Sequence, residues 1–413
     1  MAKLLLRNLG LLDPRAGEVV GGRDVLIDGR LIVAVDRGLD ATGARVIDLG
    51  GRTLMPGLID CHVHIMASHV RFGLNATGHI PASLATAHAA ERLRAMLARG
   101  FTAIRDAGGA DLGHKLAVEQ GLFSGPRLFI AGRAISQTGG HGDFRERVDH
   151  SEPCGCAHML NGIGRVADGI SEVRRAARDE IRLGADQIKV MASGGVASVA
   201  DPIHFLQYSV EELEALVDEA RRARTYVMAH AYSAEAIARC IAAGVRTIEH
   251  GNLLDEPTAR MMAERGAYLV PTLSTYFALA EHGAALGFPE DGLQKLKNVL
   301  SVGTKSLEIA RAAGVKMAFG TDLLGELQVH QSGEFTIRAA VLSPLEIIRS
   351  ATLVGAEVLA MEGRLGVVEP GAFADLLAVD GNPLEDLRLL QDDGAHLALI
   401  VKDGAIVKNS LSR

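Results

Sequence analysis

The segment RLRAMLARGFTAIRD, residues 92–106, contains an amphipathic helix, then Gly100, then a short apolar strand. Glycine directly after a helix adopts the left-handed backbone conformation that ends the helix and releases the chain into the next strand. Ser209 and Glu212 have the spacing of a capping box, which marks the start of another helix. The order of helix, glycine and strand recurs at four later positions, Gly184, Gly244, Gly266 and Gly314. The sequence therefore predicts alternating helices and strands along the middle of the chain.

Eight strands are expected between Leu54 and Asp322. Five follow the glycines above, and the others are LIDCHVH (58–64), RLFIAGRAIS (127–136) and YVMAHAY (226–232). Short strands that are apolar throughout, rather than alternating, are typical of a parallel sheet that is buried on both faces. Eight such units favour a closed barrel over an open doubly wound sheet. We therefore predict an α/β fold with a TIM-like (β/α)8 barrel over residues 57–364.

The two ends of the chain have a different pattern, in which short strands are joined by tight turns. Residues 1–56 contain DVLIDGRLIVAVD, and residues 365–413 contain GAFADLLAVDGNP and LALIVKDGAIVKN. Asp-Gly between alternating apolar residues predicts a hairpin, and the text LIDGRLIVAV nearly repeats in IVKDGAIVKN. We expect both ends to pair into one small antiparallel β-sandwich domain beside the barrel.

The composition excludes several classes of protein. The 413 residues carry a net charge of −7 and are 48% hydrophobic and 23% charged, as in a soluble globular chain. A pI near 6.1 without runs of Lys or Arg argues against nucleic-acid binding, and no apolar window is long enough to span a membrane. The N-terminal apolar patch is too short for a signal peptide, and four cysteines make no disulfide scaffold. We therefore expect a cytoplasmic protein with no nucleic-acid or membrane partner. The cysteines are Cys61, Cys154, Cys156 and Cys240.

Histidines and one aspartate lie at the ends of the predicted barrel strands. His62 and His64 are two residues apart in a strand, so both imidazoles can point to the same side and converge on a metal. Three further strands end at His230, His250 and Asp322. Because barrel active sites lie at the carboxyl ends of the strands, these residues together predict a metal site.

Two charged residues in the predicted strands have more than one interpretation. Lys189 is flanked by apolar residues and should point into the barrel, where an unpaired ammonium is costly. It could pair with a carboxylate such as Asp322, or be carboxylated by CO₂ to a carbamate that bridges two cations, and the residues alone favour neither. Glu249 is expected to face away from its neighbour His250 and to form a structural ion pair.

Further residues are candidates for contacts with a substrate. The glycine-rich loop GGHGDF (139–144) carries His141, and such a loop lets the backbone approach a ligand closely. Tyr232 follows His230 and could point its hydroxyl toward the site. The alternatives are a surface-loop histidine and a packing tyrosine. The segment 196–208 is expected to cover the site, with the candidates His204, Gln207 and Tyr208.

The segments TLMPGLIDCHVH, ADQIKVMASGGVAS, MAHAYS, TIEHGN, FGTD and PGAFADLLAVDGNP together resemble the amidohydrolase superfamily over essentially the whole chain. The branch that the chain resembles contains the prolidase-type Xaa-Pro dipeptidases and the imidazolonepropionase-related carboxypeptidases. The resemblance implies two divalent metal ions, usually zinc, bridged by a carboxylated Lys189 and a hydroxide. One ion would be held by His62, His64 and Asp322, and the other by His230 and His250.

This resemblance also implies roles in catalysis. Two divalent ions lower the pKa of a bridging water and polarise the scissile carbonyl. Asp322 would take the hydroxide proton and return it to the leaving nitrogen, which an amide needs because its anion leaves poorly. His141 and Tyr232 would contact the carbonyl and the terminal carboxylate of the substrate.

We therefore predict a zinc-dependent amidohydrolase that cleaves a small dipeptide or N-acyl amino acid, with Xaa-Pro dipeptides as the first choice. By resemblance the protein should be a homo-oligomer. One alternative is a carboxypeptidase or amidase acting on Xaa-Arg/Lys or on N-acyl aromatic amino acids such as ochratoxin-type amides. Another is a cyclic amidase of imidazolonepropionase or dihydropyrimidinase type. A deaminase is disfavoured by the bridging lysine, and a catalytically silent binding protein by the complete ligand set.

Overall fold

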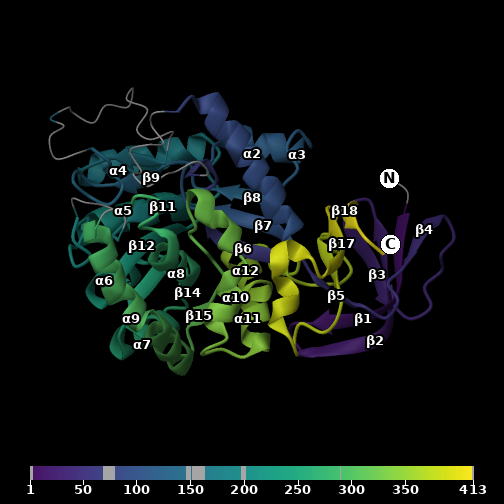
Figure 1. Cartoon of the computed structure of the whole chain (residues 1–413). Helices are drawn as coiled ribbons and strands as arrows, with labels where there is room; N and C mark the ends of the chain where they lie inside the picture. The colour runs from purple at the N-terminus through teal and green to yellow at the C-terminus, as the bar shows by residue number, and fades with distance from the viewer. Residues whose placement is uncertain are drawn as a thin grey trace.

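The computed structural model describes residues 3–67, 80–145, 150, 163–196, 201–288 and 290–411. Cys154 and Cys156 lie outside these residues. The chain has an α/β fold in which parallel strands are surrounded by helices, and a second sheet contains segments from both ends of the chain (Figure 1).

All eight predicted strands are present in the middle of the chain, and the third is divided into two. One further strand, β10 (Gly164–Val166), was not expected. The strands pair in parallel in two groups, β6-β7-β8 and β10-β9-β11-β12-β13-β14-β15. Their bounds are β6 (Leu58–Val63), β7 (Phe101–Asp106), β8 (Arg127–Ile130), β9 (Ala134–Ser136), β11 (Ile188–Met191), β12 (Val227–Ser233), β13 (Thr247–Leu253), β14 (Tyr268–Val270) and β15 (Lys316–Met317).

Backbone hydrogen bonds also connect the two groups of strands. The amide of Cys61 in β6 donates to Phe319 O at 2.8 Å, just after β15. The amide of Asp186, just before β11, donates to Ile130 O in β8 at 2.7 Å. The first predicted strand therefore lies beside the last, and the strand ends that carry polar residues gather at one place.

Helices follow the strands as the sequence predicted. Gly244 ends α6 in the left-handed conformation with φ 93°, and Gly100, Gly184, Gly266 and Gly314 also have positive φ. Ser209 and Glu212 form the predicted capping box of α5. The α-helices of the described residues are α2 (Ala82–Ala98), α3 (Leu112–Glu119), α4 (Gly169–Arg182), α5 (Val210–Arg222), α6 (Ala234–Ala243), α7 (Glu256–Glu264), α8 (Leu273–His282), α9 (Glu290–Ala313), α10 (Gly333–Arg338), α11 (Pro344–Ser350) and α12 (Leu353–Val358).

The chain ends form one eight-stranded sheet, ordered β18-β17-β16-β5-β1-β2-β3, with β4 also paired to β1. The two predicted Asp-Gly hairpins are confirmed, since β2 pairs with β3 and β17 with β18 in antiparallel fashion. The expectation of an all-antiparallel module is wrong. β4 and β5 pair with the edge of β1 that β2 leaves free. Both run in the same direction as β1, so these pairings are parallel. The strands are β1 (Lys3–Asp13), β2 (Glu18–Asp28), β3 (Leu31–Asp36), β4 (Ala44–Asp48), β5 (Thr53–Pro56), β16 (Leu376–Val379), β17 (Leu397–Lys402) and β18 (Ala405–Asn409).

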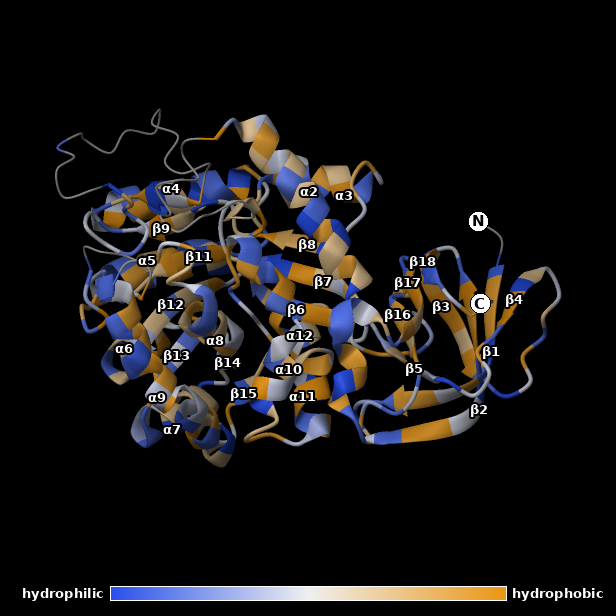
Figure 2. Ribbon diagram, in the orientation of Figure 1, coloured by the Kyte–Doolittle hydropathy of each residue, from blue (hydrophilic) through white to orange (hydrophobic). Residues whose placement is uncertain are grey.

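The terminal sheet packs against the rest of the chain through apolar side chains. Leu377 and Leu397 belong to the same buried cluster as Phe101 of β7 and Leu93 of α2. Gly100 lies at this contact, where a Cβ would come within 2.8 Å of Leu397 Cδ1. The helices carry both hydrophilic and hydrophobic residues, as expected when one face packs on the strands (Figure 2). Among the described helices, none combines the length and the apolar character needed to cross a bilayer.

Candidate metal centre and active site

The predicted ligands from separate strands line one cavity. β6 ends beside His62 and His64, β12 contains His230, β13 contains His250, and Asp322 follows β15. These side chains surround one cavity at the ends of the parallel strands. It is lined by His62, His64, Ala67, His141, Phe144, Ile163, Lys189, Met191, His230, His250, Asp322 and Leu324. The structure thus brings together all six predicted metal ligands.

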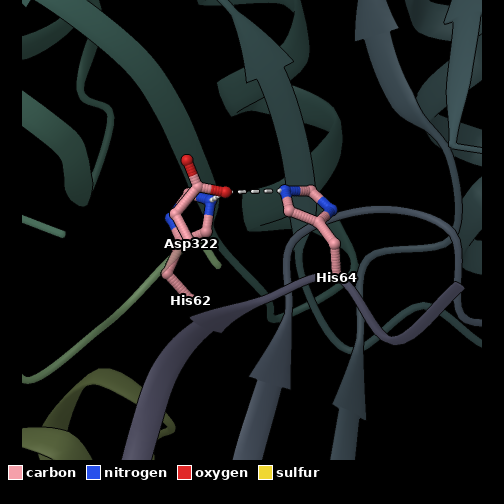
Figure 3. A group of neighbouring side chains, drawn as sticks. All are labelled: His62, His64 and Asp322. Atoms are coloured by element: carbon pink, nitrogen blue, oxygen red, sulfur yellow. Dashed lines mark ion pairs between the residues drawn. The ribbon is translucent and has the colours of Figure 1, made fainter. Parts of the chain in front are cut away.

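The tightest group in this cavity consists of His62, His64 and Asp322 (Figure 3). One ligand atom from each lies within 4.8 Å of the others. Oδ1 of Asp322 is 3.5 Å from Nε2 of His62 and 3.4 Å from Nε2 of His64. Two imidazole nitrogens and a carboxylate oxygen that converge in this way match the donor atoms that zinc and similar divalent ions prefer.

The hydrogen bonding of the His62 ring supports its predicted role as a metal ligand. Nδ1 of His62 bonds to Oε2 of Glu249 at 2.7 Å, whereas its Nε2 is buried without a hydrogen-bond partner among the described residues. A buried polar atom without a partner is costly, and a metal ion would satisfy it. The residues present therefore fit a metal ion.

The other three histidines are held by one ring nitrogen each. His64 bonds through Nδ1 to Gly108 O at 2.8 Å, and His250 through Nδ1 to Thr272 Oγ1 at 2.7 Å. His230 contacts Gly194 O through Nε2 at 3.3 Å. Fixing one nitrogen orients the ring and leaves the other for a ligand.

Burial favours the neutral form of the four imidazoles that are predicted metal ligands. It lowers the pKa of His64 to about 4, with a smaller contribution from the charge of Lys189. Burial also holds the pKa values of three more histidines well below the usual one, namely His62, His230 and His250. Neutral imidazole is the form that coordinates metals, so these histidines need not lose a proton first.

Lys189 of β11 is buried in the cavity, and burial lowers the pKa of its ammonium. Among the described residues it has no ion-pair partner, so the pairing with Asp322 that the sequence left open is not seen. The negative charges of Glu249 and Asp322 favour the charged ammonium form, but neither carboxylate is close enough to form an ion pair with it. A lowered pKa increases the fraction of free amine, the form that reacts with CO₂.

Glu249 forms the structural ion pair that the sequence predicted, and it does more. Its carboxylate accepts from Arg105 at 2.9 Å and from Thr247 Oγ1 at 2.6 Å, while also contacting His62. The side chains of Glu249 and Arg105 are completely buried. The contact with His62 was missed because it joins residues from different strands.

The candidate substrate contacts are placed differently from one another. His141 lines the cavity and stacks on His230, with 4.2 Å between ring centroids. Tyr232 stacks on His250, but its hydroxyl bonds to the hydroxyl of Tyr276 at 2.7 Å. Both residues lie beside metal-ligand candidates, and their contact with a substrate stays a prediction.

Of the segment 196–208, which was expected to cover the site, the described residues 196 and 201–208 do not line the cavity. Gln207 is buried behind His141 and accepts its backbone amide at 3.0 Å. Tyr208 belongs to the apolar core, where its hydroxyl donates to Ala167 O at 2.7 Å, and His204 is exposed. None of these three lines the cavity formed by the described residues.

Among the carboxylates near the site that were not singled out from the sequence are Asp106 and Asp201. Asp106 accepts backbone amides of Gly108 and Ile65, and so fixes the loop whose carbonyl holds His64. Its position at the end of the strand FTAIRD was the available signal. Asp201 bonds to Nδ1 of His141 at 3.1 Å, and no local pattern marked it.

A set of neutral imidazoles and a carboxylate, gathered at the ends of parallel strands, is typical of metal-dependent hydrolases. Residues 53–407 match the amidohydrolase family. The chain belongs to this family, whose members generally bind metal ions and hydrolyse amide bonds.

Individual relatives cover nearly the whole chain. A prolidase whose crystal structure contains N-methylphosphonate-L-proline is 53% identical, with a TM-score of 0.96 over 98% of this chain and 100% of that one. A Xaa-Pro dipeptidase solved with bound methionine is 32% identical, with a TM-score of 0.88 over 99% and 100%. The ochratoxinase of Aspergillus niger is 33% identical over 98% of this chain and 87% of its own length.

Proposed function

We propose that this protein is a binuclear metal-dependent dipeptidase that hydrolyses small dipeptides or N-acyl amino acids, with Xaa-Pro dipeptides as preferred substrates. The observation that carries the proposal is the 53% identity to a prolidase solved with a proline phosphonate. The cavity supports the proposal, because the six residues predicted as metal ligands all line it.

Two metal ions would be held by the residues of the cavity. His62, His64 and Asp322 would hold one ion and His230 and His250 the other, with a carboxylated Lys189 as the shared ligand. The mixed nitrogen and oxygen donors favour zinc. When bound, such ions would polarise the scissile carbonyl and activate a water molecule.

The protein side chains would move the proton and orient the substrate. Oδ1 of Asp322 lies 3.5 Å from Nε2 of His62 and 3.4 Å from Nε2 of His64, so this carboxylate would sit beside the attacking water. Asp322 would accept the proton of the attacking water and deliver it to the leaving nitrogen. His141 would contact the substrate from the cavity wall, and Tyr232 would do so by exchanging its bond to Tyr276.

The proposal also includes the domain architecture, the cellular location and the oligomeric state of the enzyme. The backbone bonds between β6 and the segment after β15 support a closed (β/α)8 barrel over residues 57–364. Residues 1–56 and 365–413 would form the composite terminal domain. The cytoplasmic location and the homo-oligomeric state are proposed from the sequence and from the family resemblance.

A second candidate activity is the hydrolysis of N-acyl aromatic amino acids. The 33% identity to an ochratoxinase favours it, and part of the cavity wall is apolar, with Phe144, Ile163 and Leu324. Such a wall would accept an aromatic ring as readily as a proline ring.

A substrate panel on protein of measured metal content tests both activities. The panel contains Xaa-Pro, Xaa-Arg and Xaa-Lys dipeptides, N-acetyl amino acids and an ochratoxin-type N-acyl phenylalanine. We expect the highest kcat/KM for a Xaa-Pro dipeptide. A double variant that carries both His62→Ala and His64→Ala, prepared in parallel, should show no turnover. Turnover of other members without Xaa-Pro cleavage would overturn the specificity, and no amide hydrolysis at all would overturn the proposed function.

A further inference from the structure

His141 is held by a group of buried polar side chains outside the metal-ligand set. Oδ2 of Asp201 lies 3.1 Å from Nδ1 of His141. The same oxygen accepts the amide of Gly195 at 3.1 Å and Nε2 of Gln207 at 3.3 Å. Gln207 in turn accepts the backbone amide of His141 at 3.0 Å. The ring and the backbone of His141 are therefore fixed by one connected network.

Burying these polar side chains is costly, which indicates a functional role for the hydrogen bonds that they make to His141. Asp201 is 1% exposed and Gln207 is 2% exposed. A carboxylate without solvent is tolerated when several donors satisfy it, and here three different groups share one oxygen. Apolar residues of similar size would fill this space at lower cost, but they would not hold an imidazole by its nitrogen.

The shape around His141 fits its ring closely. A Cβ on Gly195 would overlap the imidazole, so the absence of a side chain there makes room for the ring. A Cβ on Gly140 would come within 2.7 Å of Gln207 Oε1. The ring also lies flat on His230, with an angle of 19° between the planes. The ring thus has defined neighbours at Gly195, at His230 and, through Nδ1, at Asp201.

A lysine from a distant helix holds the same segment. Nζ of Lys295 in α9 donates to Gly195 O at 3.2 Å and to Asp201 O at 3.4 Å. It bonds the backbone on both sides of the carboxylate network. The position of Asp201 therefore depends on packing between α9 and this segment, not on local turn geometry alone.

We propose that Asp201 is a positioning residue for His141 in the hydrolysis of the substrate. By accepting from Nδ1, Asp201 fixes the tautomer and the orientation of the ring, so that the ring meets the substrate through Nε2. This role deepens the proposed function and rests on it, because His141 is the group that would touch the substrate. Asp201 acts through His141 and makes no contact with the reacting atoms.

A double-mutant cycle on the metal-loaded enzyme tests the proposal. We expect Asp201→Ala to lower kcat/KM by about 10- to 100-fold, with both metals retained, and Asp201→Asn to lower it less because an oxygen acceptor remains. In a His141→Gln background, removal of the Asp201 carboxylate should change kcat/KM by less than about 3-fold, because the residue it positions is gone. Equal losses in both backgrounds would overturn the proposal.

A matched control separates positioning from general damage to the fold. Asp186 also accepts a backbone amide, from Ile130 at 2.9 Å, and pairs with Lys115, but it does not contact His141. We expect Asp186→Asn to lower the melting temperature with little change in kcat/KM. If Asp201→Asn lowers only the melting temperature in the same way, then Asp201 is structural and the proposal is wrong.

Crystal structures of the metal-loaded wild-type and Asp201→Ala enzymes give a readout that does not need a substrate. We expect the ring of His141 to rotate and to lose its stacking on His230 in the variant. An unchanged ring would overturn the positioning role. Failure of the substrate panel, by contrast, would overturn the proposed function and leave this structural result standing, so the two failures are distinguishable.

Discussion

Oε2 of Glu249 lies 2.7 Å from Nδ1 of His62, and both side chains are buried. Arg105 and Thr247 also bond to this carboxylate, and Nε of Arg105 donates to Cys61 O at 2.7 Å. The network connects β6, β7 and β13 beneath the cavity. It orients the ring of His62 so that Nε2 faces Asp322.

We predict that Glu249→Gln weakens metal binding about 10- to 100-fold, because the ring of His62 loses its charged acceptor. Metal occupancy measured by elemental analysis across a series of metal buffers checks this. Glu180→Gln is the matched control, since Glu180 is also buried and paired with Arg133 but lies on α4. Equal metal affinity of Glu249→Gln and the wild-type protein would contradict the role of this network.

We predict that Asp322→Asn retains much of the metal but lowers kcat about 10²- to 10⁴-fold, the usual contribution of general acid–base catalysis. The amide keeps an oxygen for coordination but cannot take up and return a proton. Hydrolysis rates and metal content are measured on the same preparation. A variant with near-wild-type kcat would exclude Asp322 as the proton carrier.

The site residues that could be predicted are those whose position at a strand end follows from the sequence of that strand alone. His62, His230 and Asp322 each close an apolar segment, so their place at a strand end is visible locally. The contact of Glu249 with His62 and Arg105 is not visible, since the three residues come from three strands. Side chains meet across a barrel interior only once the register of every strand is set.

The same limit applies to the segment that was expected to cover the site and to the terminal sheet. Tyr208 adopts φ 58° and turns its hydroxyl to Ala167 O, a direction that residue type does not predict. The Asp-Gly hairpins at residues 28–31 and 402–405 were predicted because the turn chemistry is local. The parallel pairing of β4 with β1 depends on where the chain returns, so it was missed.

We predict that Lys189 carries the added mass of one CO₂ in the native, metal-loaded protein. Native mass spectrometry near neutral pH, compared with the acid-denatured chain, detects this addition, because carbamates decompose in acid. Lys189→Ala should lose the second metal ion and nearly all activity. An unmodified Lys189 in a fully active, metal-loaded enzyme would exclude the carbamate as the shared ligand.

We predict that Gly195→Ala lowers kcat/KM by at least about 10-fold while the metal content stays unchanged, because the new Cβ displaces the ring of His141. Gly21→Ala is the control, since a Cβ there has no neighbour within 4 Å. Steady-state kinetics and elemental analysis on both variants check this. Similar activity of the two variants would show that His141 tolerates displacement.

We predict that Glu219 of α5 stabilises the fold in a pH-dependent way. Arg178 and Arg174 of α4 bond to its carboxylate, at 2.7 Å and 2.6 Å, and lower its pKa to about 2. Because the folded-state pKa lies below the ordinary value of 4.5, the stabilisation is fully present above pH 4.5 and is lost as the pH falls toward 2. The melting temperature of Glu219→Gln should therefore lie below that of the wild-type protein at pH 6, and the difference should narrow below pH 4.5.

Melting temperature is measured against pH for both proteins, and one curve is subtracted from the other. The subtraction removes the effects of metal loss in acid, which both proteins share. A difference that stays constant from pH 6 to pH 3 would show that the ion pair adds no pH-dependent stability.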